Sequence, residues 1–168
     1  MDVASKKISH LQIRPITSAE ELDAVARLRY QVYVNELGRH PEGCDDNLQR
    51  LVDPEDIYSI VFAAYSKDKV VGTFRITPAD QLEKNSSWRE LYDNDKFPVE
   101  PNKQFIFSRM IVSNEFRGCG LAAEFFKAAF ASIREAGGEL AFLHCQSHLV
   151  SLYEVMGFRR YKSGFIHE

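Results

Sequence analysis

The sequence predicts a single α/β domain of the α+β kind, with a mixed, mostly antiparallel sheet flanked by helices. Strand-like and helix-like segments alternate in the second half of the chain, which implies at least one parallel strand pair there. Two strand-like segments, 56–66 and 69–78, are joined by a tight turn and predict an antiparallel hairpin. The length of 168 residues fits one domain over residues 1–168.

The first segments predict a strand followed by a helix. Residues 10–16 have strand character, and Thr17 and Ser18 are each followed three residues later by glutamate, which is a capping-box pattern. A helix is therefore expected to begin there and to end at Leu37-Gly38. Its predicted apolar face consists of Leu22, Val25, Ala26, Leu28, Val32 and Tyr33.

Two polar stretches separate the regular elements. Residues 38–56 are rich in glycine, proline, acidic and amide side chains, and residues 81–104 are polar except for a short helix expected near 87–94. Loops of this length are uncommon in compact domains and often functional. We expect both stretches to lie on the substrate side of the domain.

The second half predicts strands and helices in alternation. The helix that follows the glycine-rich segment is expected to bury Leu121, Phe125, Phe126, Ala129, Phe130 and Ile133 and to stop at Gly137-Gly138. The predicted elements are strand 104–112, helix 121–136, strand 139–146, helix 147–157 and a last strand 158–166.

Composition excludes several classes of protein. A net charge of −3 argues against nucleic-acid binding through bulk positive charge. The first ten residues lack the apolar core of a signal peptide, and no apolar run is long enough to span a bilayer. Three cysteines without CxxC spacing argue against a disulfide framework or a zinc site. We therefore expect a cytoplasmic protein without a metal.

The segment before the helix at 121–136 is the strongest local motif. Gly118, Gly120 and Ala122 precede or open this helix, and Arg117 precedes them. Free amides at a helix start bind anions, and glycine lets a ligand approach the backbone. A tight turn with Arg117 in solvent is an equally good interpretation of the loop alone. The residues required by a nucleoside-triphosphate loop are missing, as is the acidic residue that completes a dinucleotide fingerprint.

A second motif supports an acyl-CoA site. The run from Arg117 to Ala122 fits R/Q-x-x-G-x-G/A, and about 30 residues later SLYEVMGFRRY places Leu-Tyr before Gly-Phe. With these two signatures the chain resembles the GCN5-related N-acetyltransferase (GNAT) superfamily. The resemblance implies splayed central strands and transfer of an acyl group, acetyl or longer, from acetyl-CoA or another acyl-CoA to a primary amine by direct attack.

The resemblance also assigns roles to residues. Tyr153 is the implied general acid, although a packing role in a short helix is the alternative. The implied CoA-binding residues are Met110, Ile111, Val112, Arg117, Gly118, Cys119, Gly120, Leu121 and Ala122.

The first half resembles acyl-homoserine-lactone synthases and long-chain N-acyl amino acid synthases of the same superfamily. This resemblance implies a long-chain acyl-CoA or an acyl carrier protein as an alternative donor. The lactone synthases carry a glutamate at the position of Ile106 and favour an aromatic residue at the position of Arg39. These two differences argue against lactone formation. The residues implied to bind the amine or build its site are Arg29, Tyr33, Asp46, Arg75 and Arg109.

Several alternatives stay open at this level. Convergent arginines favour an amine that carries a carboxylate, such as an amino acid, but they could equally form structural ion pairs. A non-catalytic acyl-CoA sensor is a further alternative, whereas a Cys-His hydrolase is disfavoured because Cys145 and His144 point to opposite faces of a strand. The sequence assigns no oligomeric state. The candidates for the general base are His144, His148, Asp45, Asp46 and Asp53.

Overall fold

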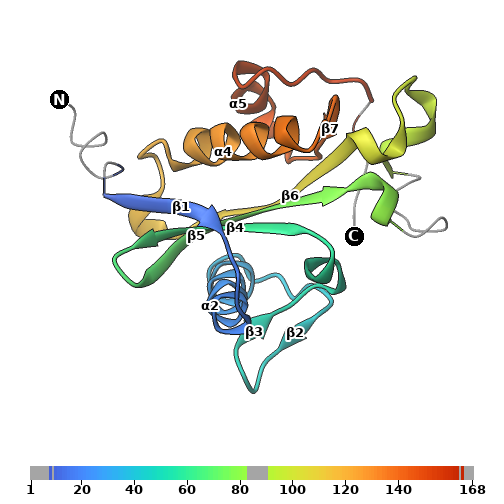
Figure 1. Ribbon diagram of the computed structural model, residues 1–168. Helices are drawn as coiled ribbons and strands as arrows, with labels where there is room; N and C mark the ends of the chain where they lie inside the picture. Colours follow the sequence, from blue (N-terminus) through green and yellow to red (C-terminus); the bar gives the residue numbers. More distant parts are fainter. Residues whose placement is uncertain (1–7, 9, 83–90, 163, 165–168) are drawn as a thin grey trace.

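The computed structural model describes residues 8, 10–82, 91–162 and 164 (Figure 1). A central sheet separates helices α4 and α5 on one face from helix α2 and a small hairpin on the other. The strands are β1 (Leu11–Pro15), β2 (Cys44–Asp45), β3 (Arg50–Leu51), β4 (Ile60–Ser66), β5 (Lys69–Pro78), β6 (Gln104–Val112) and β7 (Leu140–Phe142). The α-helices with both ends in the described residues are α2 (Ala19–Tyr30), α4 (Leu121–Glu135) and α5 (Val150–Val155).

The sheet has five strands in the order β1-β4-β5-β6-β7. The pairs β1–β4, β4–β5 and β5–β6 are antiparallel, and β6–β7 is parallel. The predicted class, a mixed and mostly antiparallel sheet flanked by helices, is confirmed, and so are the central hairpin and the parallel pair in the second half.

Helix α2 begins where the capping pattern predicts. The Ser18 side chain accepts a hydrogen bond from the backbone N–H of Glu21, which satisfies one of the free amides of the first turn. The helix continues into the π-helical segment η1 (Gln31–Glu36), and the chain then turns at Gly38, whose φ is +62°. π-Helical turns are rare and often occur at functional sites. The position of η1 at the end of α2 therefore indicates that this end of the helix belongs to a functional site.

The largest core lies between the sheet and α4. Five of the six α4 residues predicted to be buried are buried, and Phe130 is half-buried. Gly72 of β5 permits this close packing, because a Cβ there would lie 2.9 Å from the ring of Phe125. Burial of this aromatic face is the main force that holds α4 on the sheet.

Two expectations differ from the structure, and a third cannot be compared over most of its length. The stretch 38–56 contains the hairpin β2–β3 and enters the 3₁₀ segment η2 (Pro54–Ile57), so it is only partly a loop. The predicted last strand is wrong for 158–162 and 164, the part of it that the structure describes, because none of these residues is in a strand. The helix expected near 87–94 falls largely outside the described residues.

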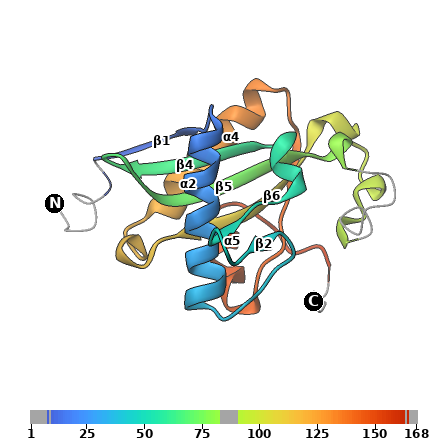
Figure 2. The ribbon, with the colours of Figure 1, turned by 90° about the horizontal axis from the view of Figure 1, so that it is seen from below.

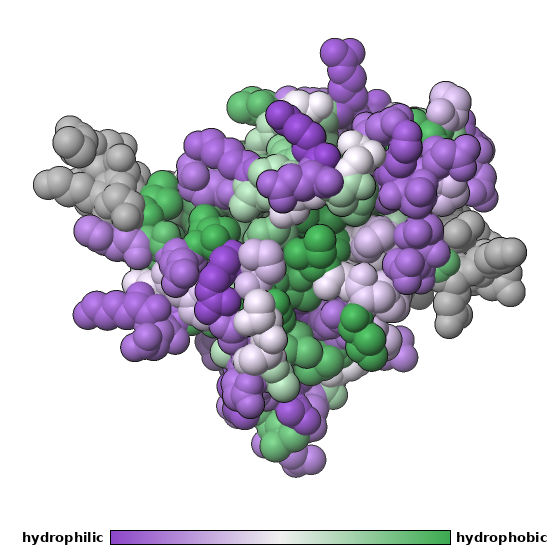
Figure 3. Space-filling view, in the orientation of Figure 1, coloured by the Kyte–Doolittle hydropathy of each residue, from purple (hydrophilic) through white to green (hydrophobic). Residues whose placement is uncertain are grey.

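Figure 2 shows α2 running across the strands, with η1 projecting toward the side where α5 lies. In Figure 3, polar side chains cover most of the face seen in Figure 1, and hydrophobic ones gather in a band in its middle. None of the helices in the described part of the chain has the length and apolar character needed to cross a membrane.

Candidate active site

Strand β7 pairs with only the first part of β6. The parallel ladder joins Gln104, Phe105 and Ile106 to the three residues of β7 and ends at the pair Ile106–Phe142. Beyond Ile106, the edge of β6 that faces β7 has no strand partner in the described residues, up to Val112. We call this unpaired stretch of β6 the strand divergence. It leaves backbone groups of 107–111 on this edge available to a ligand, whereas the Val112 carbonyl accepts a hydrogen bond from Arg117.

A β-bulge interrupts β6 inside the divergence. The pairing with β5 shifts between Thr73–Ile111 and Arg75–Ser108, and Arg109 adopts a φ of +53°. A left-handed conformation at a residue other than glycine costs of order 1 kcal/mol or more and persists only where neighbours hold it. The bulge redirects the backbone at Met110, the first of the predicted CoA-binding residues.

The glycine loop follows β6 directly and leads into α4. Gly118 and Gly120 have φ values of +73° and +91°, and Gly120 is the N-cap residue of α4, so no side chain caps this helix. A Cβ built on Gly118 would meet no atom within 4 Å, so the space beside Gly118 is open, whereas a Cβ on Gly120 would lie 3.1 Å from the Ile8 side chain. The Cys119 thiol is buried and donates to the Phe116 carbonyl. Only the backbone of Cys119 can therefore face a ligand.

Arg117 lies at the mouth of this loop and already has an acidic partner. Its guanidinium forms an ion pair with Glu36 of η1 and donates to the Val112 carbonyl over 3.1 Å. The Arg117 side chain remains 44% exposed. Arg39, three residues after Glu36, has its guanidinium against the side-chain amide of Gln146, which follows β7. The segment 36–39 thus lies against the chain after β6 and the chain after β7.

A buried charge network lies on the α2 side of the sheet, centred on Asp53. Arg109 Nε donates to one Asp53 oxygen over 2.6 Å, and Arg109 Nη2 donates to the other. Arg75 Nη1 donates to the same carboxylate over 3.0 Å. Tyr33 covers the Arg109 guanidinium, with 5.3 Å between its carbon and the ring centroid. These contacts hold Arg109 in its left-handed conformation.

Asp56 completes the network. It accepts hydrogen bonds of 2.6 and 3.0 Å from the buried Arg29 guanidinium, and one of 3.3 Å from Arg75. Burial alone would raise the pKa of Asp56, but the hydrogen bond from Arg29 and the charges of Arg29 and Arg75 hold it below its ordinary value. The network therefore combines three guanidinium groups with two buried carboxylates, Asp53 and Asp56.

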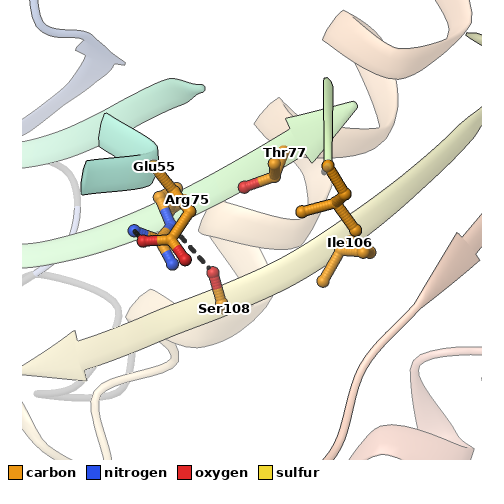
Figure 4. Close-up of a pocket in the computed structure, with 6 residues that line it drawn as sticks. Glu55, Arg75, Thr77, Ile106 and Ser108 are labelled. Atoms are coloured by element: carbon orange, nitrogen blue, oxygen red, sulfur yellow. Dashed lines mark hydrogen bonds and ion pairs between the residues drawn. The ribbon is translucent and has the colours of Figure 1, made fainter. Parts of the chain in front are cut away.

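A small cavity lies next to the network (Figure 4). Arg75 Nε donates to Ser108 Oγ over 3.0 Å, and Glu55, half-buried, lies 3.6 Å from Arg75 Nη1. Thr77, Leu82 and Ile106 form the rest of the wall. The cavity joins charged, hydroxyl and apolar groups, and Ser108 in its wall is one residue before Arg109 of the bulge in β6.

Tyr153 of α5 lies on the opposite side of the divergence. Its ring contacts Phe126 and Phe158, with centroid separations of 5.7 and 6.1 Å. Burial raises the pKa of Tyr153 to about 12, and Cys145 and Tyr33 add smaller effects in the same direction. The Tyr153 phenol therefore stays protonated at neutral pH.

The structure separates some predicted residues from the others. Asp46 lies in the hairpin region with a side chain that is 64% exposed, and it bonds to Tyr30 and His40 rather than to the arginines. The structure does not bring Asp46 together with the arginines, because Asp53 and Asp56 are their partners. A role of Asp46 in binding the amine stays a prediction.

Among the candidates for a base, His144 lies near a buried tyrosine. Its Nδ1 is 2.7 Å from the hydroxyl of Tyr92. His148 lies in the exposed first turn of the short segment η7 (Ser147–Leu149). In the residues that the structure describes, no cluster of His, Cys, Asp and Glu side chains could hold a metal ion.

Sequence reasoning missed Asp56, Glu55 and Ser108. A signal for Asp56 exists, because Asp53-Pro-Glu-Asp56 has the spacing of a capping box. The Asp53 N–H donates to Asp56 over 3.1 Å in the structure, which places both carboxylates on one turn. Ser108 and Glu55 carry no such local signal, because their meeting depends on the pairing of β5 and β6 and the position of η2.

Comparison with known proteins identifies the family. A model described as an acetyltransferase (GNAT) domain matches residues 28–125, more than half of the chain, and a second model with this description matches residues 99–168. The chain therefore belongs to the GNAT acetyltransferase family, a class of N-acyltransferases. No curated protein sequence matches the chain.

Solved structures share this fold at low sequence identity. The CoA-dependent acyl-homoserine lactone synthase BjaI is 20% identical, with a TM-score of 0.73 over 89% of this chain and 73% of that one. A GCN5-related N-acetyltransferase from Ralstonia eutropha JMP134 is 18% identical, with a TM-score of 0.65 over 94% and 98%. Escherichia coli ElaA is 17% identical, also with a TM-score of 0.65, over 94% and 92%.

Proposed function

We propose that this protein transfers an acyl group from acyl-CoA to the primary amine of a small molecule by direct attack. The observation that carries the proposal is the divergence of β6 and β7, which opens toward the glycine loop and the uncapped first turn of α4. An extended thioester fits between diverging strands, and a diphosphate fits at a helix N-terminus. The proposal treats residues 1–168 as a single acyltransferase domain.

The donor site consists of backbone amides and one cation. The amides of the first turn of α4 and of the glycine loop face open space at Gly118, and Arg117 can exchange Glu36 for a diphosphate. Leu121 is buried in the core, so it would contribute its N–H alone. The proposed CoA-binding residues are Met110, Ile111, Val112, Arg117, Gly118, Cys119, Gly120, Leu121 and Ala122.

The acceptor site in this proposal is the cavity beside Arg75. Arg29, Tyr33 and Arg109 shape it through the charge network, and Arg75 lines it. Three guanidinium groups face two buried carboxylates, which leaves one positive charge for Glu55 or a substrate carboxylate to balance. An amino acid is therefore the acceptor class that we favour.

The chemistry requires three things from the chain. The donor carbonyl must be polarised, the amine must be neutral, and the departing thiolate must be stabilised. The Met110 N–H, redirected by the bulge at Arg109, is our candidate for the oxyanion contact. Tyr153 is our candidate general acid. With its pKa raised to about 12, it stays protonated at neutral pH, and it must approach the sulfur closely to deliver its proton.

A second candidate is an enzyme that resembles an autoinducer synthase or an N-acyl amino acid synthase. The fold similarity to BjaI favours it, and a solved BjaI complex contains isopentyl-CoA by its description. Ile106 lines the cavity with an apolar side chain, which argues against lactone formation in this chain. Donor supply by an acyl carrier protein belongs to this candidate, and a cytoplasmic location stays a prediction for both.

Release of free thiol tests the proposal. Acetyl-CoA and a panel of primary amines that includes the common amino acids should give amine-dependent thiol release. Acetylated acyl carrier protein serves as the competing donor. Tyr153→Phe should lower kcat at least 10-fold and leave the Kd of acetyl-CoA unchanged. Binding of acetyl-CoA without thiol release for any amine would contradict the proposal and favour a sensor.

A further inference from the structure

Four phenylalanine rings fill the space on the α4 side of the strand divergence. We call this set the aromatic wedge: Phe107 of β6, Phe126 and Phe130 of α4, and Phe158 after α5. The Phe107 ring contacts the other three, with centroid separations of 5.6, 5.6 and 5.7 Å. Phe126 also contacts Phe130 and Phe158 at 5.9 and 5.6 Å. The wedge is therefore a closed, mutually packed cluster.

The wedge stands directly behind the point where the strands part. Phe107 follows Ile106, which forms the last pair with β7. Phe107 and Phe126 are each only 3% exposed, and Phe126 and Phe158 also pack against the Tyr153 ring. A group that entered the divergence from the glycine loop would meet these rings before it could pass into the space between α4 and the sheet.

The other side of the divergence is equally unsuited to an alkyl chain. On the α2 side lie the buried charges of Arg75, Asp53 and Asp56 and the small cavity beside Ser108. Placing methylene groups against these buried charges is unfavourable. It would also occupy the space that the amine needs.

We propose that the aromatic wedge determines donor specificity and restricts the protein to short acyl groups of about two to four carbons. The inference rests on the proposed function, because it places the thioester beside Tyr153. A longer chain would have to separate packed rings on one side or cover buried charges on the other. Phe126 and Phe158 are the specificity-determining residues, because both touch the wedge and Tyr153.

Calorimetric Kd values for CoA, acetyl-CoA and octanoyl-CoA test this inference without an acceptor. In the wild type, octanoyl-CoA should bind at least 10-fold more weakly than acetyl-CoA. Phe126→Leu and Phe158→Leu each replace a ring by a smaller aliphatic side chain with little loss of core volume. Each should reduce the ratio of the octanoyl-CoA Kd to the acetyl-CoA Kd at least 5-fold. Phe62→Leu is the matched control, because Phe62 is 2% exposed on β4, two strands away from β6.

The outcomes are distinguishable. If octanoyl-CoA binds the wild type as well as acetyl-CoA does, the inference is wrong and the proposed function stands. The inference is also wrong if Phe126→Leu and Phe158→Leu change the ratio no more than Phe62→Leu does. If neither thioester nor CoA binds the wild type, the proposed function itself fails, and the inference fails with it.

Discussion

At the scale of single residues, the site depends on side chains that never need to meet a substrate. Asp53 accepts hydrogen bonds from Arg75 and Arg109, and Arg109 holds the strained bulge in β6. A buried carboxylate with two guanidinium partners is costly to remove, because the cations then lack a counter-charge. Asp53 therefore connects the charge network to the geometry of the proposed oxyanion contact.

We predict that Asp53→Asn lowers the free energy of unfolding by about 3 kcal/mol and also lowers acyl transfer. Urea unfolding monitored by circular dichroism measures the first effect. Asp46→Asn is the control, because the Asp46 side chain is mostly exposed and its loss should cost less than about 0.5 kcal/mol. Equal stability losses in the two variants would contradict the role of Asp53.

Asp56 predicts a dependence of stability on pH. Its pKa in the folded protein is held below its ordinary value by Arg29 and Arg75 against the effect of burial, whereas in the unfolded chain it is about 3.9. Between these two values the unfolded chain binds more protons, so the stabilisation is complete above about pH 4 and is lost as the pH falls toward the folded pKa. Asp56→Asn should flatten the slope of unfolding free energy against pH in this acid range. An unchanged slope in urea titrations would be inconsistent with this assignment.

At the scale of elements, local patterns predicted the regular structure well where an element carries its own periodicity. Helix α4 shows its apolar face and its glycine stop in the sequence, and β4 to β6 show runs of β-branched and aromatic residues. The glycine loop could also be predicted from the sequence, because its motif lies within six consecutive residues. The strand expected over 158–166 is absent from the part of it that the structure describes. Strand-like composition is not sufficient, because a strand also needs a neighbouring strand to pair with.

Elements that depend on distant partners were not predictable. The hairpin β2–β3 has only two residues in each strand, and segment η1 differs from α2 by its hydrogen bonding alone. The Asp53–Arg109 contact joins positions 56 residues apart, and the Glu36–Arg117 contact joins positions 81 apart. Such contacts depend on the tertiary arrangement and leave no local pattern.

The contact between η1 and the glycine loop gives a prediction at this scale. Glu36→Gln removes the carboxylate that neutralises Arg117, so CoA should bind about 2- to 5-fold more tightly at low salt and by less at high salt. Calorimetry at two ionic strengths measures this. Glu135→Gln, at the far end of α4, is the control and should leave the Kd unchanged. A weaker affinity in Glu36→Gln would mean that Glu36 assists the donor rather than competing with it.

At the scale of the whole molecule, the two sides of the sheet carry different tasks. The α4 side buries the aromatic core, and the α2 side concentrates the buried charges. The bulge at Arg109 lies on the strand between them, and the glycine loop follows that strand (Figure 1). In the proposed function, donor binding, the position of the thioester carbonyl and the acceptor site therefore all depend on β6 and the turn that follows it.

The central claim is that the backbone before α4 holds the diphosphate of the donor. Gly118 and Gly137 form a matched pair, because their φ values are +73° and +75° and a Cβ on either would meet no atom within 4 Å. Replacing either by leucine should cost a similar 1–2 kcal/mol of stability through backbone strain. Only Gly118 lies at the proposed donor site.

The most direct measurement is therefore the calorimetric Kd of CoA for the wild type, Gly118→Leu and Gly137→Leu. We predict that Gly118→Leu weakens CoA binding at least 10-fold and that Gly137→Leu leaves it within 2-fold of the wild type. Equal CoA affinity in all three proteins would contradict the account.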